Sequence, residues 1–265
     1  MVSHPRRWYG RTDERTNLPD GIRVSVCMAT YNGATYIREQ LDSILSELDI
    51  DDEVVVVDDA STDGTVNIVR AIGDRRIRVF DRAENLGYVR TFEESLLRSR
   101  GEYLLLSDQD DVWLPGRVGT MLDVLRTETV VASNMVILGT GERPNWWMPA
   151  RTARQWYRNL LRIVAGVSGY YGCGMGLRRD ALRVLTPFPA FLTESHDLWM
   201  ALGGNLLHSV GLVEAPTLQR RVHGENVTPL RPRSVGKVLA ARIMLLRALF
   251  VLARRIRRLR SVQTS

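Results

Sequence analysis

Residues 53–64 read EVVVVDDASTDG, in which four consecutive valines are followed at once by two aspartates. A short apolar run of β-branched residues predicts a buried strand, here Glu53–Val57. The residues that follow the aspartates, Thr65–Ile72, have the apolar spacing of a helix. A strand, an acidic turn and a helix in this order indicate a sheet that binds ligands at the carboxyl ends of its strands.

The alternation of strands and helices continues on both sides of this unit. We expect strands at 24–28, 77–80, 103–106 and 130–138, and helices at 35–48, 92–97 and 115–125. Continuous apolar strands separated by helices predict an α/β fold, with a mostly parallel sheet flanked by helices. After residue 138 the alternation stops, and helices are expected at about 152–164 and 179–185. This second half is expected to pack onto the first sheet without forming a separate domain.

Length and charge define three regions. The chain has 265 residues, 45% of them hydrophobic and 25% charged, which is typical of a globular protein. We divide it into a flexible leader (1–21), a body (22–228, with halves 22–138 and 139–228) and a basic helical tail (229–265). The net charge is +6, but the tail alone carries ten arginine and lysine residues and no acidic residue. Such a tail suits an anionic membrane surface or a nucleic acid.

Several protein classes are disfavoured by what the sequence lacks. Cys27 and Cys173 are the only cysteines, so a disulfide scaffold is excluded and two buried, reduced thiols are expected. The Arg-rich first 21 residues lack the apolar segment of a secretory signal. No uncharged apolar run reaches the roughly 18 residues of a spanning helix. We therefore expect a cytoplasmic protein, peripheral at the inner face of the cell membrane.

Acidic residues gather at three points of the chain. Asp58 and Asp59 follow the valine strand, three aspartates stand at 108, 110 and 111, and Asp197 follows His196. Crowded carboxylates repel one another unless a cation neutralises them, and Mg²⁺ and Mn²⁺ prefer oxygen ligands. The second cluster therefore favours a metal site over a solvated turn. Helix capping is the alternative for the first cluster and for Asp197, which otherwise suits a general base.

Seven motifs together resemble the inverting family 2 glycosyltransferases of the GT-A fold, and most closely the rhamnosyltransferase-like members of bacterial polysaccharide synthesis. The resemblance covers about residues 24–227, and its first four motifs are strongly specific. The motifs are VSVCMATYNG (24–33), VDDASTDGT (57–65), NLG (85–87) with Arg90 and Phe92, LSDQDDVW (106–113), GCGM (172–175), HDLW (196–199) and RVHGENV (221–227).

This resemblance implies a role for individual residues. The nucleotide would be bound by Ala29, Thr30, Tyr31, Asp58, Asp59, Arg90 and Asp108. A divalent metal, Mn²⁺ or Mg²⁺, would be held by Asp108, Asp110 and His223, with Asp110 as the direct ligand. Asp197 would be the catalytic base. The acceptor would be bound by Gly172, Cys173, Gly174, His196 and Trp199.

The implied activity is a metal-dependent, inverting hexosyl transfer. The donor would be a dTDP- or UDP-sugar, with dTDP-rhamnose as the first choice. The acceptor would be a hydroxyl group of a glycan or a lipid-linked molecule in the synthesis of cell-surface polysaccharide. No specific nucleic acid is expected as a partner, although the basic tail suits an anionic membrane surface.

Some residues depart from the family pattern, and two other activities remain open. Val222 precedes His223 where the family often has glutamine, and Leu198 with Trp199 stands where two aromatic residues are common. A sugar-1-phosphate nucleotidyltransferase should have a glycine-rich, basic loop after its first strand, but residues 29–34 hold one glycine and no cation. A nucleic-acid binder would use the tail, which has Phe250 as its only aromatic residue and no base-reading motif.

Overall fold

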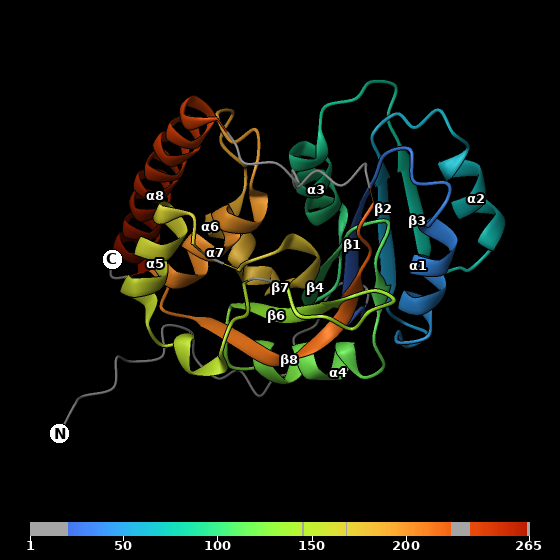
Figure 1. Cartoon of the computed structure of the whole chain (residues 1–265), viewed down its shortest axis with the longest axis horizontal. Coiled ribbons are helices and arrows are strands. Elements are labelled where there is room, and N and C mark those ends of the chain that lie inside the picture. Colours follow the sequence, from blue (N-terminus) through green and yellow to red (C-terminus); the bar gives the residue numbers. More distant parts are fainter. Residues whose placement is uncertain (1–20, 145, 168, 224–233, 264–265) are drawn as a thin grey trace.

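The computed structural model describes residues 21–144, 146–167, 169–223 and 234–263. Its centre is an eight-stranded sheet with helices on both faces (Figure 1). The strands are β1 (Val24–Thr30), β2 (Glu53–Asp58), β3 (Ile77–Asp81), β4 (Tyr103–Ser107), β5 (Val112–Trp113), β6 (Val130–Ile137), β7 (Met175–Arg178) and β8 (Val210–Arg220). The helices are α1 (Ile37–Leu45), α2 (Thr65–Ile72), α3 (Tyr88–Arg98), α4 (Arg117–Leu125), α5 (Trp156–Ala165), α6 (Leu182–Leu185), α7 (His196–Leu206) and α8 (Val235–Gln263).

The strands lie in the order β3-β2-β1-β4-β7-β6-β8-β5. The first four are parallel, β7 is antiparallel to both of its neighbours, β6 and β8 are parallel, and β5 is antiparallel to β8. The expected mostly parallel sheet flanked by helices is therefore confirmed. Strands β7 and β8 were not expected, and through them the second half of the chain extends the sheet.

Each face of the sheet contributes to a separate apolar core. Along β1, Val24, Val26 and Met28 are fully buried against α1 and α4, whereas Cys27 faces the opposite core with α3 and α7. This alternation follows from the two-residue period of a strand. Each fully buried large aliphatic side chain contributes about 1.5–3 kcal/mol. Two covered faces explain why β1, β2 and β4 read as continuous apolar runs.

The parallel strands end at one edge of the sheet, and their register aligns the polar residues that follow. Thr30 at the end of β1 is level with Asp58 at the end of β2, and Met28 is level with Ser107 at the end of β4. The aspartates after β2 and β4 therefore lie on either side of the β1 end. This arrangement brings two acidic motifs together that are 50 residues apart in the sequence.

Helix α8 is packed against the body. Its buried face contacts α5, α6 and α7, and consists of Ala241, Met244, Leu245, Ala248, Leu252 and Ile256. Arg255 donates hydrogen bonds to the carbonyl oxygens of Val184 at 2.9 Å and Pro187 at 2.6 Å. The described part of the tail, from residue 234, is thus an integral helix. The leader, apart from Gly21, and residues 229–233 of the tail lie outside the described residues.

None of the helices in the described ranges combines the length and the apolar character that crossing a bilayer requires.

Candidate active site

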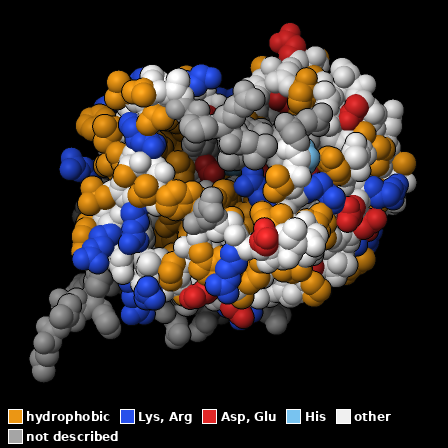
Figure 2. All heavy atoms as spheres, viewed as in Figure 1, with side chains coloured by type: hydrophobic (Ala, Val, Ile, Leu, Met, Phe, Trp, Pro, Cys, Tyr) orange, Lys and Arg blue, Asp and Glu red, His pale blue; other side chains and the backbone are white. Residues whose placement is uncertain are grey.

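A cavity of about 910 Å³ lies at the carboxyl ends of β1 and β4 and extends to α7 and α8. The hollow is visible near the middle of the space-filling view (Figure 2). It brings together most of the residues to which the sequence assigned a role. Those that line it are Ala29, Thr30, Tyr31, Asp59, Asp108, Asp110, Gly172, Cys173, His196, Asp197 and His223.

Four predicted residues, Asp58, Arg90, Gly174 and Trp199, are not among those that line the cavity, and each has other contacts. Trp199 is fully buried, and its Nε1 donates to the carbonyl oxygen of Leu185 at 3.0 Å. Gly174 is buried against β6, where a Cβ atom would lie 2.8 Å from the carbonyl oxygen of Ser133. Arg90 donates to Glu93 at 2.6 Å and to the carbonyl oxygen of Pro189 at 2.7 Å. Trp199 and Gly174 are therefore packing residues, and the guanidinium of Arg90 holds α3 to the segment after α6.

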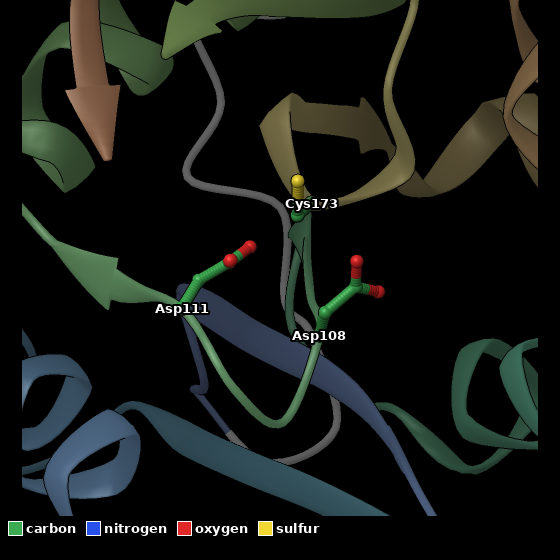
Figure 3. Close-up of side chains that lie close together, drawn as sticks. All are labelled: Asp108, Asp111 and Cys173. Atoms are coloured by element: carbon green, nitrogen blue, oxygen red, sulfur yellow. The ribbon is translucent and has the colours of Figure 1, made fainter. Parts of the chain in front are cut away.

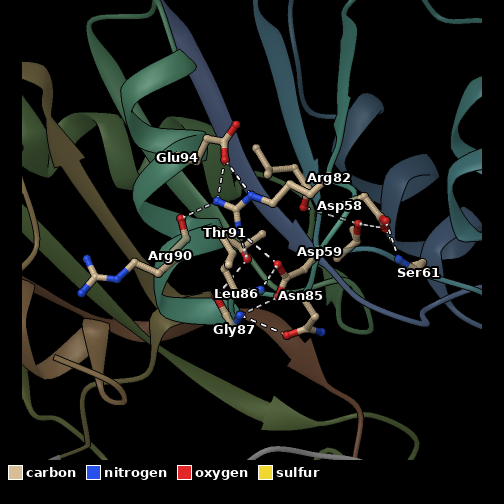
Figure 4. A network of polar contacts seen from close by, with 12 residues as sticks. Asp58, Asp59, Ser61, Arg82, Asn85, Leu86, Gly87, Arg90, Thr91 and Glu94 are labelled. Carbon is tan, nitrogen blue, oxygen red and sulfur yellow. Dashed lines mark hydrogen bonds and ion pairs between the residues drawn. The ribbon is translucent and has the colours of Figure 1, made fainter. Parts of the chain in front are cut away.

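Asp58 and Asp59 hold loops together (Figure 4). Asp58 accepts hydrogen bonds from the Thr30 hydroxyl at 2.7 Å and from the backbone amide of Ser61 at 2.8 Å. Its side chain is buried and is not among the cavity-lining residues, so this carboxylate is engaged by the two loops that it joins.

Asp59 borders the cavity, and its carboxylate accepts hydrogen bonds from the loop before α3. The backbone amides of Leu86 and Gly87 donate to it at 2.9 and 2.8 Å, and the Arg82 guanidinium donates at 3.0 Å. Arg82 also pairs with Glu94 of α3. Asp59 therefore fixes the NLG loop at the cavity wall, where that loop contributes Asn85 and Gly87.

The acidic turn after β4 places three aspartates, Asp108, Asp110 and Asp111, on the cavity wall. Asp108, Asp111 and the Cys173 thiol each present a ligand atom, and these atoms lie within 4.8 Å of one another (Figure 3). Burial, with the nearby charges of Asp111 and Asp110, raises the pKa of Asp108 well above its usual value of 3.8. Burial and Asp110 likewise raise the pKa of Asp111 to about 6.

Asp110, in the same turn, pairs with His223. Its Oδ2 lies 2.7 Å from Nε2 of His223, which follows β8. The ring of Tyr36 lies 4.9 Å from the His223 ring. The structure thus brings together the histidine and the aspartate that the sequence assigned to a metal, although 113 positions separate them.

The donor set fits a hard divalent cation. Within the described ranges, Oδ2 of Asp111 is buried and has no hydrogen-bond partner, and the adjacent carboxylates repel one another. A cation with oxygen ligands would relieve both features. Burial raises the pKa of the Cys173 thiol well above its usual value. Mn²⁺ and Mg²⁺ prefer oxygen to sulfur ligands, so the carboxylates are the better donors of this group. Asp108, Asp110, Asp111 and His223 are therefore the residues that would hold the metal.

Asp197 begins α7 and faces the cavity from the side opposite β1. It is half-buried, and its Oδ1 accepts the backbone amide of Leu198 at 2.8 Å. Burial raises the pKa of Asp197 to about 6. A carboxylate with this pKa is ionised at pH 7 and still accepts a proton more readily than an ordinary aspartate, as a general base requires.

His196, beside Asp197, is buried in the cavity wall and stays neutral. Burial lowers its pKa to about 3, and its ring stacks on Phe92 with 4.2 Å between centroids. Among the described residues, neither ring nitrogen has a hydrogen-bond partner. Gly172 faces this ring, and a Cβ atom there would lie 2.8 Å from Nε2 of His196. Only glycine at 172 leaves this space open.

The sequence placed Asp111 in the acidic cluster that favours a metal site, but it was not assigned as an individual ligand. Gln109 and Arg117 were not identified from the sequence. Gln109 joins the ends of β1 and β4, since its side-chain amide exchanges two hydrogen bonds with the backbone of Tyr31, at 2.8 and 2.9 Å. Arg117 is almost fully buried and donates to the carbonyl oxygen of Cys173 at 2.7 Å. Glycine at 33 gave an indirect signal for Gln109, because a Cβ atom there would overlap that side chain.

Comparison with known proteins points to one family. The family model for "Glycosyl transferase family 2" matches residues 25–186, which is more than half of the chain. The chain is 35% identical over 193 residues to an uncharacterised glycosyltransferase of Rickettsia felis, covering 68% of this chain and 31% of that protein. It is 30% identical over 128 residues to the dTDP-rhamnosyl transferase RfbG of Shigella flexneri, with 44% of each chain covered. The match spans less than half the length of these relatives.

Solved structures share the fold. TarS residues 1–349 of S. aureus, in complex with UDP-GlcNAc, superpose with a TM-score of 0.64 at 20% identity, covering 89% of this chain and 72% of that 1–349 fragment. Glucosyl-3-phosphoglycerate synthase of Mycobacterium tuberculosis, in complex with Mn²⁺, UDP and glucosyl-3-phosphoglycerate, superposes with a TM-score of 0.57 at 19% identity. That match covers 88% of this chain and 80% of the synthase.

Proposed function

The chain belongs to glycosyl transferase family 2, and we propose that it transfers a sugar from a nucleotide-sugar to a hydroxyl group of an acceptor, with inversion at the anomeric carbon. The observation that carries the proposal is the single cavity that holds both the Asp108–Asp111 turn and Asp197. A leaving diphosphate needs neutralisation and an acceptor hydroxyl needs a base, and these two groups of carboxylates serve those needs.

We assign the donor to the side of the cavity formed by β1 and the acidic turn. Backbone and side-chain atoms of Ala29, Thr30 and Tyr31 would contact the nucleoside. A Mn²⁺ or Mg²⁺ ion held by Asp110, Asp108, Asp111 and His223 would neutralise the diphosphate as it leaves. The likeness to RfbG supports dTDP-rhamnose as the sugar donor, and the fold shared with UDP- and UDP-GlcNAc-bound transferases supports a UDP-sugar as the alternative.

The chemical step uses the chain's own base. Asp197 accepts the proton of the acceptor hydroxyl while that oxygen forms a bond to the anomeric carbon. The bond from the anomeric carbon to the diphosphate oxygen breaks, and its electron pair stays on the diphosphate. Attack from the face opposite the leaving group inverts the configuration. Holding donor and acceptor in one cavity contributes by removing their relative motion before reaction.

The acceptor would lie between Asp197 and α8. This part of the wall contains the aromatic rings of Tyr170 and Tyr171, which suit the apolar face of a sugar. Neutral His196, buried and stacked on Phe92, supports this part of the wall. We propose a glycan or lipid-linked acceptor in cell-surface polysaccharide synthesis, consistent with similarity to the putative teichuronic acid biosynthesis glycosyltransferase TuaG of Bacillus subtilis, 34% identical over 104 residues.

Release of nucleoside diphosphate from a panel of nucleotide-sugars tests this proposal. With Mn²⁺ present, dTDP-rhamnose or a UDP-sugar should yield dTDP or UDP, and Asp197→Asn should lower the rate about 10²–10⁴-fold. Asp123→Asn is the matched control, because Asp123 is 70% exposed on α4. Release of pyrophosphate from a nucleoside triphosphate and a sugar 1-phosphate would instead support the nucleotidyltransferase alternative. An unchanged rate in Asp197→Asn would contradict the role of the base.

A further inference from the structure

Helix α8 has a second apolar stripe, which is exposed and lies outside its contacts with the described part of the body. The stripe consists of Val235, Leu239, Ile243, Leu246 and Phe250, whose residues are between 51% and 85% exposed. Their spacing of three and four residues aligns them along one side of the helix. At about 100° per residue this side lies opposite the face that is buried on α7. The two opposed stripes explain why the sequence shows no single amphipathic face.

The neighbouring helix α5 adds further exposed apolar side chains. Tyr157 is 50% exposed and Leu161 is 68% exposed. Helices α5 and α8 contact each other and lie side by side at one end of the molecule (Figure 1). In the same region of the space-filling view, hydrophobic and Lys or Arg side chains are interspersed (Figure 2). We call the surface formed by these residues and the α8 stripe the α5–α8 face.

The charges of this face have one sign. Neither α5 nor α8 contains an acidic residue, and none occurs between Glu142 and Asp180. Around the α8 stripe lie the exposed cations Arg247, Arg254 and Arg257. Exposed Arg158 and Arg162 extend the set on α5. An apolar stripe bordered by arginine is the pattern of a helix that lies in the plane of a lipid surface, with its apolar side inserted and its cations at the headgroups.

We propose that the α5–α8 face docks on a membrane surface that contains anionic lipid. The charge of the face is complementary to anionic headgroups, and the exposed apolar side chains would enter the acyl boundary. Ala241, Arg242 and Leu245 of the same helix line the active-site cavity, so docking through α8 would hold the cavity beside the lipid. The proposal does not depend on catalysis, because docking needs neither donor nor metal.

Flotation of the full chain with lipid vesicles tests this docking. The wild type should float with vesicles of phosphatidylcholine and phosphatidylglycerol, and much less with phosphatidylcholine alone. Leu246→Gln/Phe250→Gln removes two exposed side chains and should lower the partition coefficient at least about tenfold, given the free energy of burying such groups. Arg254→Gln/Arg257→Gln should lower the partition coefficient about fivefold per charge at low salt, because each cation contributes about 1 kcal/mol, which is roughly fivefold. The same variant should lose the preference for anionic lipid.

A matched control separates this face from general surface hydrophobicity. Ile50→Gln/Leu97→Gln removes two side chains that are 61% and 57% exposed outside α5 and α8, and it should float as the wild type does. Unchanged thermal midpoints would show that the variants are folded. Absence of wild-type flotation, or equal flotation of the Leu246/Phe250 variant, would overturn the proposal. The chain could instead form a dimer in solution that does not bind vesicles and that Leu246→Gln/Phe250→Gln dissociates. That result would assign the α5–α8 face to contact with a second copy and would overturn the membrane proposal.

Discussion

At the scale of single residues, Asp197 combines a partly buried position with a carboxylate that is hard to ionise. Its pKa of about 6 implies a rising pH profile if it is the base. The catalytic form is the ionised one, so kcat/KM should fall about tenfold for each pH unit below about 6 and reach a plateau above it. Initial rates at saturating Mn²⁺ would measure this profile. A rate that is independent of pH through this range would contradict the assignment.

The raised pKa of Asp197 also makes the stability of the fold depend on pH. Ionisation of Asp197 favours catalysis but destabilises the folded chain. The folded chain holds the Asp197 proton more tightly than the unfolded chain, where the pKa is near 3.8. This group therefore stabilises the fold fully below that value, and its contribution is lost as the pH rises towards about 6. Asp197→Asn should raise the free energy of unfolding at pH 7 by about 1–2 kcal/mol, after allowance for solvent screening of a partly exposed group. The variant would thus be more stable and less active.

At the scale of elements, the end of β2 shows how much the sequence pattern predicts. The valine run predicted the strand and its parallel neighbours, because two covered faces require continuous apolar residues. The pattern also predicted that the aspartates lie at the ligand-binding edge. It did not predict that Asp58 accepts hydrogen bonds from Thr30 and Ser61, because these partners depend on the register of β1 and on the turn after β2.

A stability measurement distinguishes a loop-holding role of Asp58 from a ligand-binding role. Asp58→Ala leaves a buried hydroxyl and amide without their acceptor and should lower the free energy of unfolding by about 2–4 kcal/mol in urea denaturation. Asp81 of β3 is level with Asp58 of β2, but its side chain is 49% exposed. Asp81→Ala should therefore change the free energy of unfolding by less than about 1 kcal/mol. Normal stability of Asp58→Ala with weaker nucleotide binding would restore the role predicted from sequence.

Short and late elements were the least predictable. Strand β7 has only four residues, and β8 includes Pro216 and a register shift against β6, so neither has a clear strand period. Helix α8 was expected, but its two apolar stripes lie on opposite sides of the helix, so the sequence shows no single apolar face. Which stripe is buried depends on the packing surface that α6 and α7 provide.

At the scale of the whole molecule, the cavity combines residues from Ala29 to Leu245. The sequence motifs identified most of its floor, since the acidic turn and the Asp197 motif are local patterns. They could not exclude Trp199 or Arg90, whose side chains turn away from the cavity into packing contacts. They also could not show that α8 forms part of the cavity wall, because no local sequence pattern indicates that α8 packs beside the acidic motifs.

The most direct test of the account is calorimetric titration of UDP and dTDP with and without Mn²⁺. Wild-type chain should bind one of them at least about tenfold more tightly with Mn²⁺, which corresponds to about 1.4 kcal/mol. Asp110→Asn should lose this enhancement, while the exposed control Asp123→Asn keeps it. Equal affinity with and without Mn²⁺ in the wild type, or no binding of either nucleotide, would contradict a metal-assisted nucleotide-sugar site in this cavity.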